Sequence, residues 1–284
     1  MFQKLLHPYH CMGYLSFFTG PVKFRQSLVQ WADLLSRTIM EDTRHIIETF
    51  TELAPRYEAV VDSELSRFWG WSYTGFVNQL VQMTPIPEKV KMLDLATGTG
   101  VIPLLVIGKH LNNNPVHGLD ITRSMLRRAR EKACAAHVQD RLPLVCASAM
   151  EIPYADASFD LVTCALATHH MDVSRLLAET QRVLAEGGLL SMADDAGSNL
   201  WRTPVVRTLL KAAAFVYFLF KENLNRAWAE AGAVSNVRSP EEWYVSLEQA
   251  GFRDIRITRL KSKHRWIPEP LVIQAIKRNQ GATT

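Results

Sequence analysis

The segment from Val90 to Gly100 constrains the fold more than any other part of the chain. Its sequence, VKMLDLATGTG, is a strand pattern apolar on both faces that ends in a loop almost without side chains. Gly98 and Gly100 permit a positive φ and close approach by a ligand, and an apolar helix is expected directly afterwards, from Val101 to Leu111. Strand, glycine turn and helix form the first βα unit of a nucleotide-binding α/β fold.

Two features of this loop disfavour a nicotinamide or flavin dinucleotide. The dinucleotide fingerprint needs a third glycine three residues after the second, and this chain has Pro103 there. Asp94 lies in the strand just before the loop, where its carboxylate would repel a pyrophosphate. The same carboxylate suits a cationic ligand. S-adenosylmethionine, which carries an amino group and a sulfonium and no phosphate, is such a ligand.

Two further segments agree with an adenosyl ligand. Asp120 ends the next apolar strand, where its carboxylate can accept hydrogen bonds from both ribose hydroxyls. A loop at 147–154 that could flank an adenine then runs into another buried strand at about 159–164. A nicotinamide enzyme would share the acid that binds the ribose, so Asp120 alone does not separate the two classes.

The chain carries four motifs in order, at Leu93–Gly100, Gly118–Asp120, Ala149–Asp160 and Glu179–Gly188. In sequence and spacing they resemble those of the class I S-adenosylmethionine-dependent methyltransferases. The likeness is to the branch with the C-methyltransferases of menaquinone and ubiquinone biosynthesis, and it spans most of residues 50–276. It also matches the segment that covers the cofactor in that branch, which makes Tyr57 a candidate contact.

The resemblance implies a Rossmann-like, doubly wound α/β fold and S-adenosyl-L-methionine as the cofactor. It implies a mostly parallel sheet of seven strands in the order 3-2-1-4-5-7-6. The family often has Asp or Asn at the position of Ser148, so adenine recognition here would use a hydroxyl or the Ala149 backbone. The candidate cofactor-binding residues are Tyr57, Asp94, Ala96, Thr97, Gly98, Thr99, Gly100, Asp120, Ile121, Ser148, Ala149 and Ala165.

The expected organisation is an N-terminal extension with a helical cap over 1–85, followed by the methyltransferase domain over 86–284. Alternating strand and helix patterns to about Met192 predict a parallel sheet with helices on both faces. Ser239 and Pro240 predict the start of the last helix, which Gly251 ends. Helices are expected over about 24–39, 41–53, 57–69 and 73–83, and strands at 189–193, 252–260 and 271–276. The first forty residues, poor in acids, are alternatively an organellar leader.

A helical insertion, a candidate lid, is expected over 198–237. Its stretch 212–220 is apolar all round and too short to cross a bilayer. Three interpretations are open: a helix buried against the sheet, a lid over a hydrophobic substrate pocket, and peripheral membrane contact through an interfacial helix. In the last, nearby basic residues would meet the headgroups: Arg202, Arg207, Lys211, Lys221 and Arg226.

The adjacent His169 and His170 follow a core strand, at the sheet edge where ligands of open α/β folds bind. Histidine titrates in a useful range, so both are candidate catalytic bases that deprotonate the methyl acceptor. Adjacent side chains are expected to point in different directions, so that at most one faces the substrate. Alternatively, the pair caps or anchors the following helix. The other histidines are scattered, and no metal site is predicted.

Composition fits a globular cytoplasmic protein. The chain has 284 residues, of which 48% are hydrophobic and 21% charged, enough for an ample core. A net charge of +4, and basic clusters without interleaved aromatics, predict no nucleic-acid partner. Four cysteines without metal spacing are expected as reduced thiols: Cys11 and Cys134, with Cys146 and Cys164 as small hydrophobes in core strands.

Three functional classes stay open. The first is a methyltransferase acting on an apolar or amphipathic small molecule, such as a quinone, polyketide or lipid-like acceptor. The second is a catalytically silent binding or assembly module that keeps the cofactor fold, which the intact Asp94, Gly98, Gly100 and Asp120 disfavour. The third is a nicotinamide-dependent oxidoreductase, disfavoured by Asp94, Pro103 and the terminal strand pair.

Overall fold

The computed structural model describes residues 44–109, 113–198, 201, 203–264, 267 and 269–278. The chain divides into two compact units, 1–44 and 45–284, and the described residues past Arg44 belong to the second. The expected helix at 24–39 lies outside the described residues, as do Cys11 and Arg202.

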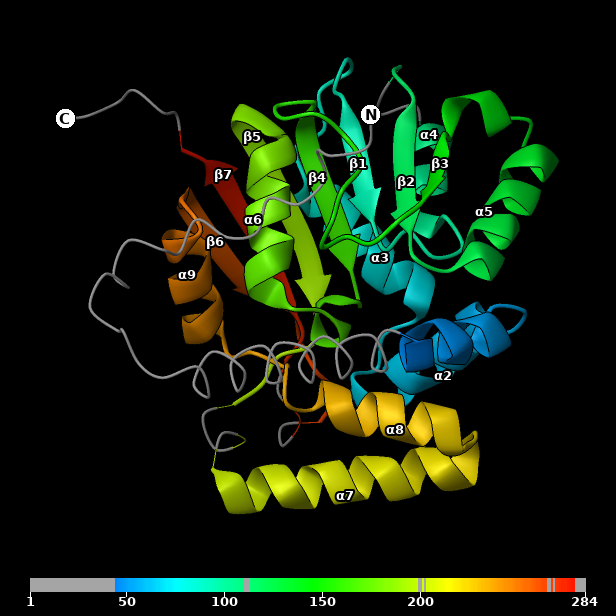
Figure 1. Cartoon of the computed structure of the whole chain (residues 1–284), viewed down its shortest axis with the longest axis vertical. Coiled ribbons are helices and arrows are strands. Elements are labelled where there is room, and N and C mark those ends of the chain that lie inside the picture. Colours follow the sequence, from blue (N-terminus) through cyan, green and yellow to red (C-terminus); the bar gives the residue numbers. More distant parts are fainter. Residues whose placement is uncertain are drawn as a thin grey trace, which may run out of the picture. The chain divides into compact units, whose positions relative to one another are not determined.

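In the described part of the chain, one seven-stranded sheet has the order β3-β2-β1-β4-β5-β7-β6, which confirms the predicted fold and strand order (Figure 1). The first five strands are parallel, and β7 runs antiparallel to its neighbours β5 and β6. The strands are β1 (Met92–Leu95), β2 (Val116–Asp120), β3 (Leu144–Cys146), β4 (Phe159–Ala165), β5 (Leu184–Asp194), β6 (Phe252–Arg259) and β7 (Leu271–Lys277).

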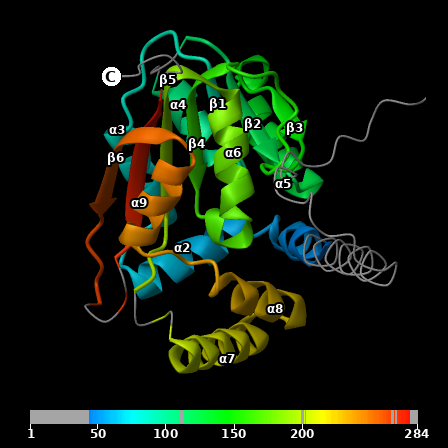
Figure 2. The ribbon, with the colours of Figure 1, turned by 60° about the vertical axis from the view of Figure 1, so that its left-hand side comes forward.

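Helices cover both faces of the sheet, as the alternating pattern predicts. Residues 44–53 are helical and lead into α2 (Tyr57–Phe68). The other helices are α3 (Tyr73–Met83), α4 (Val101–Gly108), α5 (Arg123–Ala135), α6 (Val173–Val183), α7 (Pro204–Lys221), α8 (Leu224–Ala233) and α9 (Pro240–Gln249), with short 3₁₀ helices η1 (Gln139–Arg141) and η2 (Thr168–His170). On one face lie α6 and α9, and on the other α3 and α4 (Figure 2).

Strand β1 is buried along its whole length and supplies both cores. Because successive strand residues point to opposite faces, Leu93 and Leu95 join the core under α6 and α9, whereas Met92 joins the core under α3 and α4. Trp243, fully buried on α9, is the largest side chain of the first core. Burial on both faces fixes the register of β1, and thereby the position of the loop that follows it.

The predicted start of the last helix is confirmed. Ser239 and Glu242 form a reciprocal capping box, and Pro240 occupies the first turn of α9. Gly251 follows the helix with a φ of +87°, a conformation that glycine adopts without strain.

Two expectations about strands are wrong. Strand β5 begins at Leu184 rather than at residue 189, because the chain continues to pair with β4 across a register shift between Phe159 and Leu161. Cys146 does not lie in the core but is exposed, because β3 is a three-residue strand at the sheet edge. Cys164, in the central strand β4, is buried as expected.

The insertion is helical, as predicted, but it is not a helix buried against the sheet. Among the residues of α7 only Phe218 is buried, and Phe220 is 86% exposed. Helix α7 packs along α8, where Phe215 and Trp228 meet edge to face at 4.8 Å. The two helices lie beyond the carboxyl ends of the parallel strands (Figures 1 and 2). Within the described residues, no helix is both long and apolar enough to cross a bilayer.

Candidate functional site

The loop after β1 has an open side at Gly98. Ala96, Gly98 and Gly100 all have a positive φ. A Cβ added at Gly100 would lie 3.0 Å from the Cβ of Ala129, so that glycine is required by helix packing. A Cβ added at Gly98 would meet nothing nearer than 3.9 Å, and the ring of Tyr57 would lie 4.0 Å away. A ligand can therefore approach the backbone closely at Gly98, as predicted, without a steric clash.

Asp94 is buried at the end of β1, with 1% of its surface exposed. Its Oδ1 accepts a hydrogen bond from Thr163 Oγ1 at 2.6 Å. Burial raises the pKa of Asp94 to about 7, although the bond from Thr163 favours the ionised form. A positive charge beside this carboxylate would stabilise its ionised form.

Asp120 ends β2, as predicted, and contacts the glycine loop directly. Its Oδ2 accepts from the Gly98 amide at 2.9 Å and its Oδ1 from the Thr122 amide at 2.7 Å. Burial nevertheless raises the pKa of Asp120 above its usual range. The structure thus joins the two motifs that carry Gly98 and Asp120, at the carboxyl edge of the sheet.

The polar groups around the loop fit an adenosyl cation. Thr97 Oγ1 is buried beside Asp94 and, like Thr163, favours the ionised form of that carboxyl by lowering its pKa. Thr97 thus places a hydroxyl, and Asp94 and Asp120 two ionisable carboxyl groups, beside the open Gly98 backbone. S-adenosylmethionine offers hydroxyls, an amino group and a sulfonium, which such groups can hold.

The start of α2 is tied to the glycine loop by an interaction that the sequence did not reveal. Glu58 Oε1 accepts from Thr99 Oγ1 and from Lys132 Nζ, each at 2.6 Å. Burial opposes ionisation of Glu58, but these two bonds outweigh it and hold its pKa below the usual value. Tyr57, the preceding residue, is thereby held beside the loop, and burial raises its pKa so that the phenol is neutral.

The segment expected near the adenine lies beside the end of β2. The Ala147 amide donates to the Asp120 carbonyl at 3.1 Å. Ser148 Oγ accepts from the Met150 amide at 3.1 Å, so its hydroxyl oxygen is engaged by its own loop. Adenine contact through Ala149 stays a prediction, as do the contacts of Ile121 and of Ala165, which lies at the end of β4.

His169 is held by two carboxylates. Its Nδ1 lies 2.9 Å from Asp194 Oδ1 and 3.2 Å from Asp195 Oδ1. Asp194 ends β5, and its other oxygen accepts from the Thr168 amide at 2.8 Å and from the Thr168 hydroxyl. Burial disfavours a charged imidazole, but Asp194 and Asp195 outweigh it and raise the pKa of His169 well above its usual range. The imidazole therefore has a fixed orientation.

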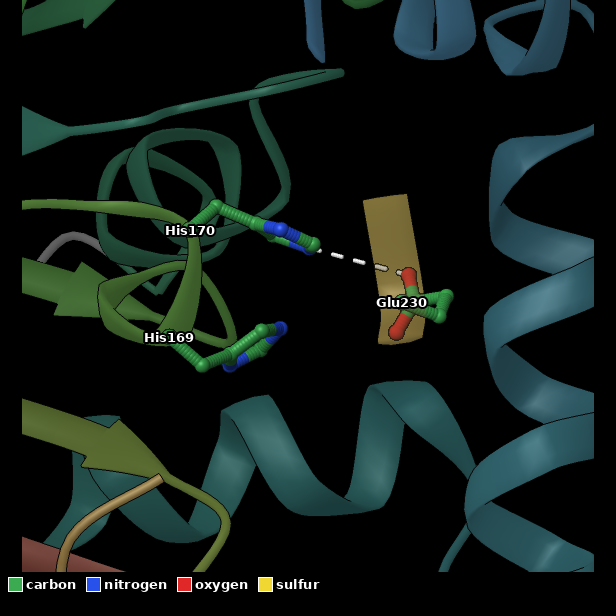
Figure 3. Close-up of side chains that lie close together, drawn as sticks. All are labelled: His169, His170 and Glu230. Carbon is green, nitrogen blue, oxygen red and sulfur yellow. Dashed lines mark ion pairs between the residues drawn. The ribbon is translucent and has the colours of Figure 1, made fainter. Parts of the chain in front are cut away.

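His170 faces α8, with its Nε2 3.6 Å from Glu230 Oε1 (Figure 3). Burial, and then the neighbouring charge of His169, lowers the pKa of His170 to about 3. The prediction that the two side chains diverge is wrong: both extend from the η2 turn toward the same side, with ring centroids 4.3 Å apart. Nor do they cap α6, because Asp172 accepts the first amides of that helix.

Two groups of side chains have ligand atoms close enough to hold a metal ion. In the described part of the chain, the ligand atoms lie within 4.8 Å of one another in each group: His169, His170 and Glu230, and His169 with Asp194 and Asp195. The sequence predicted no metal site, because these carboxylates are distant from the histidines along the chain. The Arg226 guanidinium lies 3.1 Å from Glu230 Oε1 and would compete with a cation there.

Comparison with known proteins supports the family resemblance. Residues 93–192 match the protein family described as "Methyltransferase domain". A 27-O-demethylrifamycin SV methyltransferase from Amycolatopsis mediterranei is 31% identical over 163 residues, which cover 51% of this chain and 59% of that protein. A demethylmenaquinone methyltransferase from Symbiobacterium thermophilum is 31% identical over 149 residues, covering 52% and 58%. The chain thus spans less than two thirds of the length of these relatives.

A longer match has lower identity. A ubiquinone/menaquinone biosynthesis C-methyltransferase from Geobacter sulfurreducens is 25% identical over 227 residues, which cover 76% of this chain and 84% of that protein.

Solved structures share the fold. The YcgJ protein of Bacillus subtilis superposes with a TM-score of 0.56 at 18% identity, covering 72% of this chain and 98% of that one. Geranyl diphosphate C-methyltransferase from Streptomyces coelicolor A3(2), solved with Mg²⁺, geranyl diphosphate and S-adenosyl-L-homocysteine, gives 0.56 at 14% identity, covering 78% and 84%. The domain match and the fold together support the expected cofactor, S-adenosylmethionine.

Proposed function

We propose that this chain, which carries a class I methyltransferase domain, transfers a methyl group from S-adenosylmethionine to an apolar or amphipathic small molecule. One juxtaposition carries the proposal. The ends of β1 and β2 present Asp94 and Asp120 beside the open glycine loop, and the ends of β4 and β5 present His169 with Asp194. All four lie along one sheet edge, where α/β proteins bind their ligands.

The acceptor class is supported by the helices above this edge and by the relatives. Beyond the strand ends, Phe215 of α7 meets Trp228 of α8 edge to face, and Phe218 of α7 lies under the Arg226 guanidinium of α8. The names of the relatives refer to a rifamycin and a menaquinone as acceptors. We extend that class to this chain: a quinone, polyketide or lipid-like acceptor.

When bound, S-adenosylmethionine supplies an electrophilic methyl group whose sulfur leaves as a neutral thioether, so little negative charge needs to be stabilised at the sulfur. Asp94 and Thr97 would bind the charged and polar groups of the methionyl part, and Asp120 the ribose hydroxyls. The Glu58 bridge holds Tyr57 over the loop. The main work of these residues is alignment and exclusion of water, which can lower a barrier by several kcal/mol.

His169 is the proposed base. A hydroxyl or ring carbon attacks a methyl group only after it loses a proton, and the Nε2 of His169 can take that proton while its Nδ1 donates to Asp194. Because both carboxylates raise the pKa of His169, the base is neutral only toward higher pH. His170, with a pKa of about 3, is neutral but a weak proton acceptor, so we assign it a positioning role.

The proposal is tested by ligand binding and by product. S-adenosylmethionine and S-adenosylhomocysteine should raise the melting temperature, and NAD should not. Asp94→Asn should remove most of that shift, whereas Asp140→Asn, a change at an exposed carboxylate of η1, should not. The protein is then incubated with S-adenosylmethionine and a panel of apolar acceptors, and mass spectrometry detects any acceptor that has gained a methyl group. Stabilisation by NAD alone would refute the proposal, and binding without product from any acceptor would favour a catalytically silent module.

We further propose peripheral membrane contact through α7. Val205, Leu209, Val216 and Phe220 are all at least half exposed, and their spacing places them on one face of the helix. That face extends beyond the expected segment 212–220, whereas the expectation that Arg226 meets the headgroups is wrong, because its side chain is buried beside Glu64 and Glu230. In a vesicle flotation assay, less protein should be recovered with the vesicles when Leu209, Val216 and Phe220 are all replaced by Gln. The matched change Val245→Gln, at an exposed position of α9, should have no effect. Equal recovery of both variants would refute the contact.

A further inference from the structure

Arg226 is a buried cation with unused hydrogen-bonding capacity. It lies on α8 with 6% of its surface exposed. Its Nη2 lies 3.4 Å from Glu64 Oε2 and 3.1 Å from Glu230 Oε1. Its Nε and Nη1 are buried and have no hydrogen-bond partner among the described residues. Arginine has five N–H donors, and buried donors are normally paired, so these two atoms point to a group that binds there.

The two carboxylates beside Arg226 also have oxygens to spare. Glu64 Oε1 is buried and, in the described part of the chain, accepts no hydrogen bond. Glu230 Oε1 is also buried and forms the ion pair with Arg226, but it makes no hydrogen bond to a described residue. Glu64 lies on α2, while Glu230 lies one helical turn after Arg226 on α8. Two donors of Arg226 and one acceptor of Glu64 that lack partners among the described residues therefore lie together with the ion-paired Glu230, between two helices that are far apart in the sequence.

Aromatic rings adjoin this polar cluster. The Arg226 guanidinium lies over the ring of Phe50 at 5.7 Å and over that of Phe218 at 5.3 Å. Phe50 also meets the ring of His170 at 5.3 Å and that of Tyr57 at 6.3 Å, both edge to face. Since Tyr57 borders the open side of Gly98 and His170 adjoins His169, these rings connect the cluster with the proposed sites of the methyl donor and the base.

We propose that Arg226, Glu64 and Glu230 recognise a neutral hydroxyl group on the ring of the methyl acceptor, an inference that rests on the proposed function. A hydroxyl both donates and accepts, so it can satisfy a guanidinium N–H and a carboxylate oxygen together. A carboxylate or phosphate would face two negative charges here, and an ammonium group would face Arg226. The acceptor class is thereby narrowed to phenol-like or hydroxylated ring compounds.

The test uses four probes with one ring system. 2-Naphthol, naphthalene, 2-naphthoate and 2-naphthylmethylamine present a hydroxyl, no polar group, an anion and a cation. Their binding to the full chain loaded with S-adenosylhomocysteine is measured by ligand-observed NMR and competition. We expect 2-naphthol to bind about tenfold more tightly than each of the other three, because one or two hydrogen bonds separate them.

Variants assign that preference to the cluster. Glu64→Gln and Arg226→Gln should each weaken binding of 2-naphthol by about tenfold and leave naphthalene unchanged. Glu131→Gln, at an exposed carboxylate of α5, is the matched control. If Arg226→Gln does not fold, Glu64→Gln decides, because it keeps the shape of the side chain.

The outcomes separate this inference from the proposed function. Equal binding of 2-naphthol and naphthalene, or tightest binding of 2-naphthoate or of the amine, would overturn the hydroxyl site while stabilisation by S-adenosylhomocysteine upholds the methyltransferase. Binding of none of the probes to the loaded protein also overturns the site. Failure to bind S-adenosylhomocysteine at all would instead count against the proposed function.

Discussion

Affinity for S-adenosylmethionine should rise with pH because of Asp94. Burial raises the pKa of this carboxyl from an ordinary 3.8 to about 7, so near neutral pH the apo protein holds a mixture of its two forms. Only the ionised form attracts the positively charged donor. Proton release therefore accompanies binding below about pH 7, and above it the affinity should be nearly constant.

The magnitude follows from the pKa. Each pH step of one below about 7 should weaken binding by about tenfold, and about 0.9 proton should be released per donor bound near pH 6. The difference between 3.8 and about 7 corresponds to about 4 kcal/mol of net free-energy cost for ionising Asp94 in the folded apo protein, mainly from burial. The pKa of Asp94 is higher in the folded apo protein than in the unfolded chain. The free energy of unfolding of the apo protein should therefore rise as pH falls from about 7 toward 4.

Isothermal titration calorimetry at constant ionic strength measures both quantities, with two buffers of different ionisation enthalpy to count protons. The Asp94→Asn variant should bind S-adenosylmethionine weakly, and its affinity should depend less on pH. The pH dependence that remains comes from Asp120, whose pKa is also raised. Asp140→Asn should reproduce the original curve. A dissociation constant that does not change between about pH 6 and 8, or an Asp94→Asn variant that keeps the full slope, would refute the reasoning.

Three other outcomes are expected. Asp194→Asn should lower kcat by about 10–100-fold. It should also move the rising limb of the pH–rate profile to lower pH, because it lowers the pKa of His169. A pH–rate profile that does not move would contradict the assignment of His169 as the base. Gly98→Ala should weaken donor binding and lower Tm modestly, because alanine is strained at a φ of +55° but meets no atom nearer than 3.9 Å. Gly100→Ala, with a φ of +77° and a Cβ that would lie 3.0 Å from α5, should lower Tm more, by roughly 2–8 °C; calorimetric scans and titrations that show the reverse order would refute this pairing. Dialysis against EDTA should leave the transfer rate unchanged, because Arg226 lies 3.1 Å from Glu230 and His169 Nδ1 is already paired with Asp194 and Asp195; a loss that Mn²⁺ or Zn²⁺ restores would show a metal requirement.

The sheet and the glycine loop could be predicted because their signals are local. Apolar strands, a glycine turn and an acid at a strand end are continuous in the sequence, and strand order came with the family resemblance. Glu58, Asp194 and Arg226 were not predicted as site residues. Each acts through a partner between 25 and 162 residues away, as in His169–Asp194 and Glu64–Arg226, and no periodicity marks such pairs.

The exposure of α7 was missed for a different physical reason. Apolarity all round a helix predicts burial, but it does not say against what. Here the neighbour is α8, which covers one side and leaves Val205 and Phe220 in contact with solvent. The edge position of Cys146 was missed because a short edge strand has the same apolar letters as a central one.

The separate origins of the two halves of the candidate site have an evolutionary consequence. The groups proposed to hold the donor come mainly from strand ends fixed by the central sheet, whereas Phe218, Arg226 and Glu230 come from the insertion after β5. Substitutions in α7 and α8 can therefore change which molecule is modified without disturbing the chemistry that modifies it. In a lineage with this architecture, acceptor preference should drift faster than the reaction itself.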